Sequence, residues 1–236
     1  DLRMSRGLGD VYKRQVRERF EREVVDYFTD SYFRGRTPAP CTRCNSRIKW
    51  PCLAAEADAL GIRYIATGHY FRITSAGGKR YVTRAADNRK DQSYYLWDLP
   101  QEVLDRVLTP MGTVIKRNIV EELADRRESM GVCFLEGRPC RDFLRSRDKT
   151  EALRPGPIID SAGHRLGTHD GAALYTIGQK KGLDLPPGWA VVAIDTAANR
   201  IVAGEEKLLL HRTLEVGECR CLLYTSPSPR DMRRSR

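Results

Sequence analysis

The sequence lacks a long apolar run, an N-terminal export signal and any internal repeat. A helix needs about 20 consecutive apolar residues to cross a bilayer, and no stretch of this chain approaches that length. The first residues also lack the basic, apolar and small-residue series that marks a secretory signal. These absences predict a cytoplasmic protein with no membrane partner. Its 236 residues suffice for one large domain or two modest ones.

Apolar periodicity is missing from both ends of the chain. Residues 1–15 carry four basic and two acidic residues, and residues 222–236 carry four basic and one acidic residue among serines and prolines. Both segments resemble translated vector sequence, and we expect them to be non-native or disordered. They supply half of the net charge of +10, so +5 remains for 16–221. That mild excess fits a solvated basic surface as well as an RNA footprint.

The seven cysteines do not indicate a disulfide framework, because their number is odd and the chain is not small. Cys41 and Cys44 form a C-x-x-C spacing that follows Pro38 and Pro40, which predicts a stiff loop. The pair can be half of a zinc site, although no second C-x-x-C exists, or a persulfide-handling pair activated by basic neighbours. A third interpretation is that the two cysteines are small apolar side chains buried in the core, but a loop position disfavours it. For the cysteines at positions 52, 140, 219 and 221, burial as small apolar side chains is the preferred interpretation.

Hydrophobic periodicity predicts an α/β chain. Apolar residues recur every four positions over 16–33, which predicts an amphipathic helix, and a second helix is expected over 46–60 with a kink or late start at Pro51. A buried strand over 62–67 then leads to Gly68, the order expected at the carboxyl end of a strand in a parallel sheet. Further predicted elements are a hairpin of 70–74 with 81–83 across Gly77-Gly78, helices over 101–108 and 116–127, and strands over 157–159, 190–194 and 200–202.

Six ordered sequence blocks resemble tRNA-specific 2-thiouridylases. The blocks are G-R-T-P-A-P-C-T-R-C-N (35–45) with I-K-W (48–50), I-A-T-G-H-Y (65–70), K-D-Q-S-Y-Y-L (90–96), E-S-M-G-V-C-F-L (128–135), P-G-P-I-I-D (155–160) and Y-T-I-G-Q-K-K-G-L (175–183). The resemblance implies part of a nucleotide-binding ATP-pyrophosphatase domain with a parallel sheet over 16–135. It further implies a small β-rich central domain over 136–205 and the start of a C-terminal β-barrel over 206–221.

The resemblance also implies an enzyme that thiolates tRNA. ATP with Mg²⁺ adenylates the C2 oxygen of the wobble uridine, and a sulfur relay protein or cysteine desulfurase supplies sulfur as a cysteine persulfide. By motif position Cys133 carries the persulfide, and Cys44 releases its sulfur to leave a Cys44–Cys133 disulfide. Gly68 lies against the nucleotide. The residues implied to meet tRNA are Ala39, Pro40 and Cys41 at the target base, and Lys90, Asp91 and Gln92 elsewhere. His69 is interpreted as a structural histidine.

Several features depart from the family pattern. The phosphate loop S-G-G-x-D-S is absent from the sequence, so the chain as written is not expected to hydrolyse ATP. Some members have Asp where Cys41 stands, which leaves the acid or base open, and the segment before Cys133 is shorter than usual. No bound metal is expected. The alternatives are another adenylating enzyme of the same class, a zinc-bearing RNA-binding module without catalysis, and an inert remnant.

Overall fold

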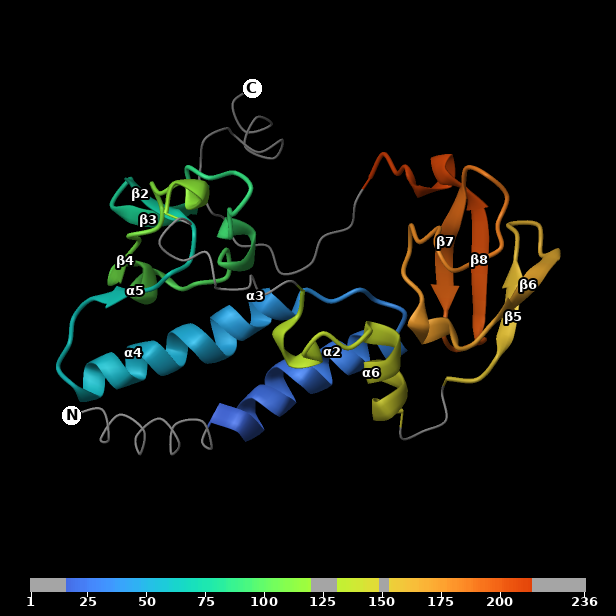
Figure 1. Cartoon of the computed structure of the whole chain (residues 1–236), viewed down its shortest axis with the longest axis horizontal. Helices are drawn as coiled ribbons and strands as arrows, with labels where there is room; N and C mark the ends of the chain where they lie inside the picture. The colour runs from blue at the N-terminus through green and yellow to red at the C-terminus, as the bar shows by residue number, and fades with distance from the viewer. Residues whose placement is uncertain (1–15, 120–130, 149–152, 214–236) are drawn as a thin grey trace, which may run out of the picture. The chain divides into compact units, whose positions relative to one another are not determined.

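The computed structural model describes residues 16–119, 131–148 and 153–213, and these divide into two compact units. The first unit comprises the described residues within Asp1–Pro40 and Glu128–Glu215. The second unit comprises the described residues within Cys41–Arg127. Figure 1 shows the elements of each unit, and no helix in the described ranges is long and apolar enough to cross a membrane.

A helix opens the first unit and confirms the prediction for 16–33. It is helical from Val16, passes through the π-helical stretch η1 (Glu21–Asp26) and continues as α2 (Tyr27–Phe33). Its four-residue apolar period buries Val24, Val25 and Phe28 on one face. Gly35 follows in a left-handed conformation, as expected for a residue beyond a helix end.

The rest of the first unit is a mixed four-stranded sheet with one helix before it. The sheet order is β6-β5-β8-β7, in which β5 pairs parallel with β8 and the other two pairs are antiparallel. Three of its strands were predicted from short apolar runs, whereas β6 and the helix α6 were not. The elements are η6 (Cys133–Leu135), α6 (Cys140–Arg147), β5 (Gly156–Ile159), β6 (Arg165–His169), η7 (Ala172–Leu174), β7 (Trp189–Asp195), β8 (Arg200–Glu205) and η8 (Glu206–Leu209).

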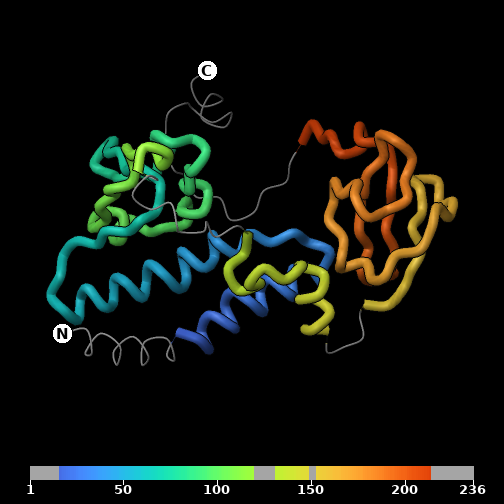
Figure 2. Tube along the Cα trace, in the orientation of Figure 1, coloured from blue at the N-terminus to red at the C-terminus, as the bar shows by residue number. Residues whose placement is uncertain are grey.

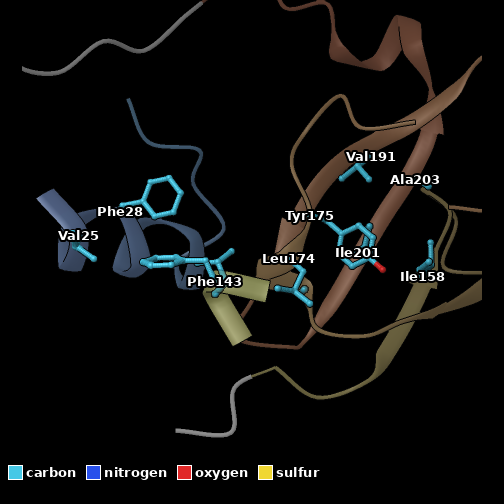
Figure 3. Packing of buried hydrophobic residues seen from close by; sticks show 11 residues of the cluster. Val25, Phe28, Phe143, Ile158, Leu174, Tyr175, Val191, Ile201 and Ala203 are labelled. Carbon is cyan, nitrogen blue, oxygen red and sulfur yellow. The ribbon is translucent and has the colours of Figure 1, made fainter. Parts of the chain in front are cut away.

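One apolar cluster joins the opening helix, α6 and three strands of the sheet, β5, β7 and β8 (Figure 3). Phe28 of α2 packs beside Phe143 of α6, with ring centroids 6.1 Å apart. Ile158, Val191 and Ile201 from three strands complete the cluster, and the last two are fully buried. Each such side chain contributes about 1.5–3 kcal/mol through its burial, so this cluster dominates the stability of the first unit.

A continuous helical run opens the second unit and corrects one prediction. It begins at Pro40 and passes through α3 (Pro40–Cys44), η2 (Asn45–Lys49) and α4 (Trp50–Ala59), as the trace in Figure 2 shows. The loop predicted for the cysteines is therefore wrong. Proline has no N–H, but the first turn of a helix leaves its N–H groups unbonded anyway, so Pro40 fits at the first position.

Pro51 is tolerated within this helix. A proline ring in a helix interior clashes with the carbonyl four residues earlier and removes one hydrogen bond. The π-helical stretch η2 includes Arg47, whose carbonyl the ring would meet, and a π-helical turn is wider there, which gives the ring room. The predicted late start at Pro51 is therefore wrong, while the predicted helical character of 46–60 is confirmed.

The remaining elements of the second unit are short. The strand expected over 62–67 is reduced to β1 (Ile65–Ala66), which pairs parallel with β4 (Val107–Leu108), because Ile62 and Tyr64 are exposed. β4 lies where a helix over 101–108 was expected, and α5 ends at Leu104. The hairpin across Gly77-Gly78 is confirmed, with Thr74 opposite Tyr81. The other elements are β2 (Arg72–Ala76), β3 (Lys79–Thr83), η3 (Ser93–Tyr95), α5 (Gln101–Leu104) and η4 (Lys116–Asn118). Most of the helix expected over 116–127 lies outside the described residues.

Candidate active site

Cys41 and Cys44 lie in the first turns of the helical run. Cys44 is 6% exposed and Cys41 is half-buried, so the two thiols differ in access to solvent. Burial of Cys44 also revises the view that the pair would be poorly buried. Ala39 and Pro40 stand immediately before them, half-buried and buried respectively. Neither cysteine forms a disulfide in the described part of the chain, nor do Cys52, Cys133 and Cys140.

Asn45 ties this cysteine turn to a distant segment of the chain. Its side-chain Nδ2 donates to the backbone carbonyl of Cys41 at 3.0 Å and to that of Tyr95 at 3.3 Å. Asn45 is 3% exposed, and its Oδ1 has no hydrogen-bond partner among the described residues. A buried amide oxygen in this state retains its capacity to accept a hydrogen bond. The amide thus fixes the helix turn that carries Cys44 against the turn that ends at Tyr95.

Gln92 holds the same segment to the block that contains Gly68. Its backbone N–H donates to the carbonyl of Tyr70 at 2.8 Å, and its side-chain Oε1 accepts from the N–H of Tyr70 at 2.9 Å. Gln92 therefore makes two bonds with one residue, in the manner of a strand partner. Through Asn45 and Gln92 the structure brings together three of the sequence blocks: 41–45, 68–70 and 90–95.

Asp91 stabilises the segment 85–93 by accepting two hydrogen bonds from residues of that segment. Its Oδ1 accepts from the backbone N–H of Ala85 at 2.8 Å, and its Oδ2 accepts from the hydroxyl of Ser93 at 2.7 Å. The neighbouring Asp87 accepts from the backbone N–H of Lys116 and from that of Arg89, and these hydrogen bonds lower the pKa of its carboxyl. Both acidic side chains are therefore turned toward amide or hydroxyl donors of their own unit.

Gly68 and His69 follow β1. Gly68 is exposed, and a Cβ built at this position would meet no atom of the described residues within 4 Å, so its backbone is open to approach by a ligand. His69 Nδ1 lies 3.0 Å from the hydroxyl of Thr67, and its ring lies 6.0 Å from that of Trp50. Burial, aided by the charge of Lys49, lowers the pKa of His69 to about 4. The imidazole is neutral at physiological pH, which agrees with the expectation of a structural histidine.

Cys133 belongs to the first unit and is exposed. It begins the 3-10 turn η6, which is followed by two left-handed residues, Glu136 and Gly137. The next side chain, Phe134, is anchored by edge or tilted ring contacts with three aromatic rings. Their centroids lie at 6.0 Å for Phe20, 5.1 Å for Phe28 and 5.4 Å for Phe143. The turn thus presents an accessible thiol from a fixed backbone.

Two polar residues near the thiols were not predicted from the sequence. Asn45 directly follows the C-x-x-C, and that adjacency is the only sequence signal it offers. Thr42 lies between the two cysteines, is 8% exposed and has no partner for Oγ1 among the described residues. No group of three or more His, Cys, Asp or Glu side chains in these described ranges is placed to hold a metal ion.

Comparison with known proteins defines the class of this fold. Residues 7–137 match the family model described as the tRNA methyl transferase HUP domain, and residues 141–205 match the tRNA methyl transferase PRC-barrel domain. The prediction of a nucleotide-binding domain of parallel α/β type followed by a small β-rich domain is thereby confirmed.

The curated relatives define the family. The tRNA-specific 2-thiouridylase MnmA of Moorella thermoacetica is 42% identical over 237 residues, which cover 95% of this chain and 66% of the relative. Those of Carboxydothermus hydrogenoformans and Pelotomaculum thermopropionicum are 43% and 39% identical and are covered over 56% and 61% of their lengths. The chain therefore belongs to the tRNA-specific 2-thiouridylase family, and it spans between about half and two thirds of the relatives it matches.

Proposed function

We propose that this chain is part of a tRNA-uridine 2-sulfurtransferase that replaces the C2 oxygen of the wobble uridine with sulfur. The proposal is carried by one observation: of the family's two motif cysteines, Cys133 is exposed and Cys44 is buried. An exposed thiol suits Cys133, because a separate protein must reach it to deliver sulfur. A buried thiol suits Cys44, because a reaction inside the site must exclude water.

The proposed chemistry has two stages. In the first, the C2 oxygen of uridine attacks the α-phosphorus of ATP, which is supplied with Mg²⁺, and pyrophosphate leaves. In the second, the Cys44 thiolate attacks the inner sulfur of the Cys133 persulfide, which forms a Cys44–Cys133 disulfide and releases hydrosulfide. Hydrosulfide adds at C2, and AMP leaves with the original oxygen. A dithiol reductant then supplies two electrons to restore both thiols.

The site residues take different parts in this proposal. Gly68 borders the nucleotide, and its exposed backbone with no neighbour near a Cβ supports that part. Ala39, Pro40 and Cys41 border the target base at the start of the helix that carries Cys44. No residue is assigned to exchange a proton with the base, because Cys41 stands where some members of the family have an acidic residue.

Lys90, Asp91 and Gln92 form the proposed tRNA contact away from the base. Lys90 offers a cation for phosphate. Asp91 and Gln92 act by shaping the turn, because their side chains are engaged with Ala85, Ser93 and Tyr70. The proposed partners are thus tRNA, ATP and a persulfide-donating relay protein or cysteine desulfurase.

The first test is persulfide loading of the chain by a cysteine desulfurase with labelled cysteine, followed by alkylation and peptide mass analysis. Wild type and Cys44→Ser should carry label on Cys133, and Cys133→Ser should carry none. Cys52→Ser, which removes a cysteine outside the two motifs, is the matched control and should load like wild type. Equal loading of wild type and Cys133→Ser would contradict the assignment.

The second test is tRNA thiolation by a chimera in which segments of the Moorella relative outside the match complete the chain. Nucleoside mass analysis should find sulfur in place of oxygen, and Cys44→Ser should accumulate persulfide without product. The family model's description favours methyl transfer as a second candidate, and an added methyl group would support it instead. A tightly held zinc that is lost in Cys44→Ser would favour the non-catalytic zinc module.

A further inference from the structure

Two adjacent tyrosines are exposed on the turn that accepts a hydrogen bond from Asn45 of the cysteine helix. Tyr94 is 67% exposed and Tyr95 is 38% exposed, although the next residue, Leu96, is fully buried. Their rings lie 5.5 Å apart at an interplanar angle of 79°. A turn that buries its leucine and leaves two adjacent aromatic rings in solvent offers apolar surface to a partner. This arrangement points to a partner that contacts the rings.

The backbone beneath the rings is fixed. The N–H of Tyr95 donates to the carbonyl of Gln92 at 3.0 Å, and the N–H of Leu96 donates to that of Ser93 at 3.0 Å. The carbonyl of Tyr95 accepts from Asn45, the residue that follows Cys44. The aromatic pair is therefore presented next to the helix turn that carries Cys44, within one unit. Little conformational entropy is lost when a ligand contacts rings on such a backbone.

The local charge favours a polyanion. Arg89 and Lys90 precede the pair on the same loop, and the two acidic residues of that loop, Asp87 and Asp91, accept hydrogen bonds from amides and a hydroxyl. Arg84, Arg89 and Lys90 outnumber the two carboxylates of this loop, and both carboxylates are engaged by hydrogen-bond donors of the same unit. Basic side chains beside exposed aromatic rings are the pattern of single-stranded nucleic-acid binding, in which rings stack on bases and cations follow phosphates.

We propose that Tyr94 and Tyr95 stack on unpaired bases of the tRNA anticodon loop that flank the target uridine. The inference rests on the proposed function for its choice of RNA. Bases in a duplex are already stacked on their neighbours, whereas bases in a loop have free faces that aromatic side chains bind. The two rings would hold the flanking bases in place, so that the uridine between those bases is presented to the helix turn that carries Cys44.

The test compares binding of two RNAs to the 236-residue chain. One is an anticodon stem-loop with the fluorescent base 2-aminopurine beside the target uridine, and the other is a fully paired hairpin of equal length. Tyr94→Ala should weaken the Kd for the stem-loop about 5- to 150-fold and reduce the quenching of 2-aminopurine. Tyr94→Phe keeps the ring and should bind like wild type.

Tyr64→Ala is the matched control, because Tyr64 is a 51% exposed tyrosine of the same unit that packs near Arg63, 5.4 Å from its ring centroid. It should leave both affinities unchanged. Circular dichroism checks that each variant is folded. A Tyr94→Ala variant that binds and quenches like wild type would overturn the stacking proposal alone. Absence of stem-loop binding by the wild-type chain would count against the proposed function as well. A change in self-association without a change in RNA affinity would mark the pair as a protein contact and sink the proposal.

Discussion

The two units differ in what holds their functional segments in place. In the first unit, the Cys133 turn is anchored by apolar contacts, through Phe134 and its three aromatic neighbours. In the second unit, the Cys44 turn is anchored by neutral amide side chains, Asn45 and Gln92, that bond to backbone groups far away in sequence. Apolar packing is strong and tolerant of small shifts, whereas hydrogen bonds are directional. The helix turn that carries Cys44 is thus positioned by the more directional contacts.

The largest change in the free energy of unfolding is expected for substitutions in the apolar cluster of the first unit. Ile201→Ala removes a fully buried side chain of β8 and should lower the free energy of unfolding by about 2–5 kcal/mol. Chemical denaturation measures the change. Leu210→Ala, at an 82% exposed position, should change it by less than about 0.5 kcal/mol. Similar losses in both variants would mean that the cluster does not carry the stability of this unit.

A smaller and more local effect is expected in the second unit. Gln92→Ala leaves the N–H of Tyr70 without its acceptor and should cost about 1–3 kcal/mol. Hydrogen exchange at the Tyr70 amide should accelerate, while exchange in β8 stays unchanged. Gln92→Glu keeps the accepting oxygen and serves as the control, with protection close to wild type. Acceleration in both variants would show that the side-chain oxygen is not the essential group.

The second unit should also lose stability in acid through His69. Its folded pKa of about 4 lies below the unfolded value near 6.5, so the unfolded chain binds the proton more tightly. The stabilisation is complete above pH 6.5 and is lost as the pH falls toward 4, by about 1–2 kcal/mol between pH 7 and pH 5. Unfolding of wild type and His69→Gln across this range measures it. Parallel curves for the two proteins would rule out the effect.

The smallest expected effect concerns the Cys133 turn. Glu136 adopts φ = 51°, a left-handed conformation in which a side chain is strained. Glu136→Gly should raise the free energy of unfolding of the first unit by about 0.5–1 kcal/mol. Gly137→Ala, at φ = 80°, should lower it by a similar amount. Thermal unfolding tests both signs, and a destabilising Glu136→Gly would indicate that the carboxylate makes a contact that outweighs the strain.

Local patterns in the sequence predicted the long helix of 16–33 and the hairpin at Gly77-Gly78, since both depend on neighbouring residues. The error at Cys41 and Cys44 has a specific cause: two prolines two positions apart were taken to exclude a helix, whereas Pro40 is compatible with a first turn. The helix of 140–147 was missed because only Phe143 and Leu144 of its eight residues are buried, too few for a visible period.

The candidate site was predictable only in part. The motif residues could be identified from their blocks, but the bonds that join the blocks could not. Asn45 reaches Tyr95 across 50 positions, and Gln92 reaches Tyr70 across 22. Such pairings depend on how the chain is folded, and no local period reports them. The exposure of Tyr94 could not be predicted for the same reason, because an S-Y-Y-L sequence is equally compatible with buried tyrosines.

The use of Asn45 and Gln92 as anchors has a consequence for the behaviour of the site in salt. Binding of a polyanion depends steeply on ionic strength, because cations on the protein displace counterions from phosphates. Amide hydrogen bonds carry no net charge, so ions screen them little and protons do not titrate them. A change of salt should therefore alter how often RNA occupies the surface while leaving the position of Cys44 against its turn the same.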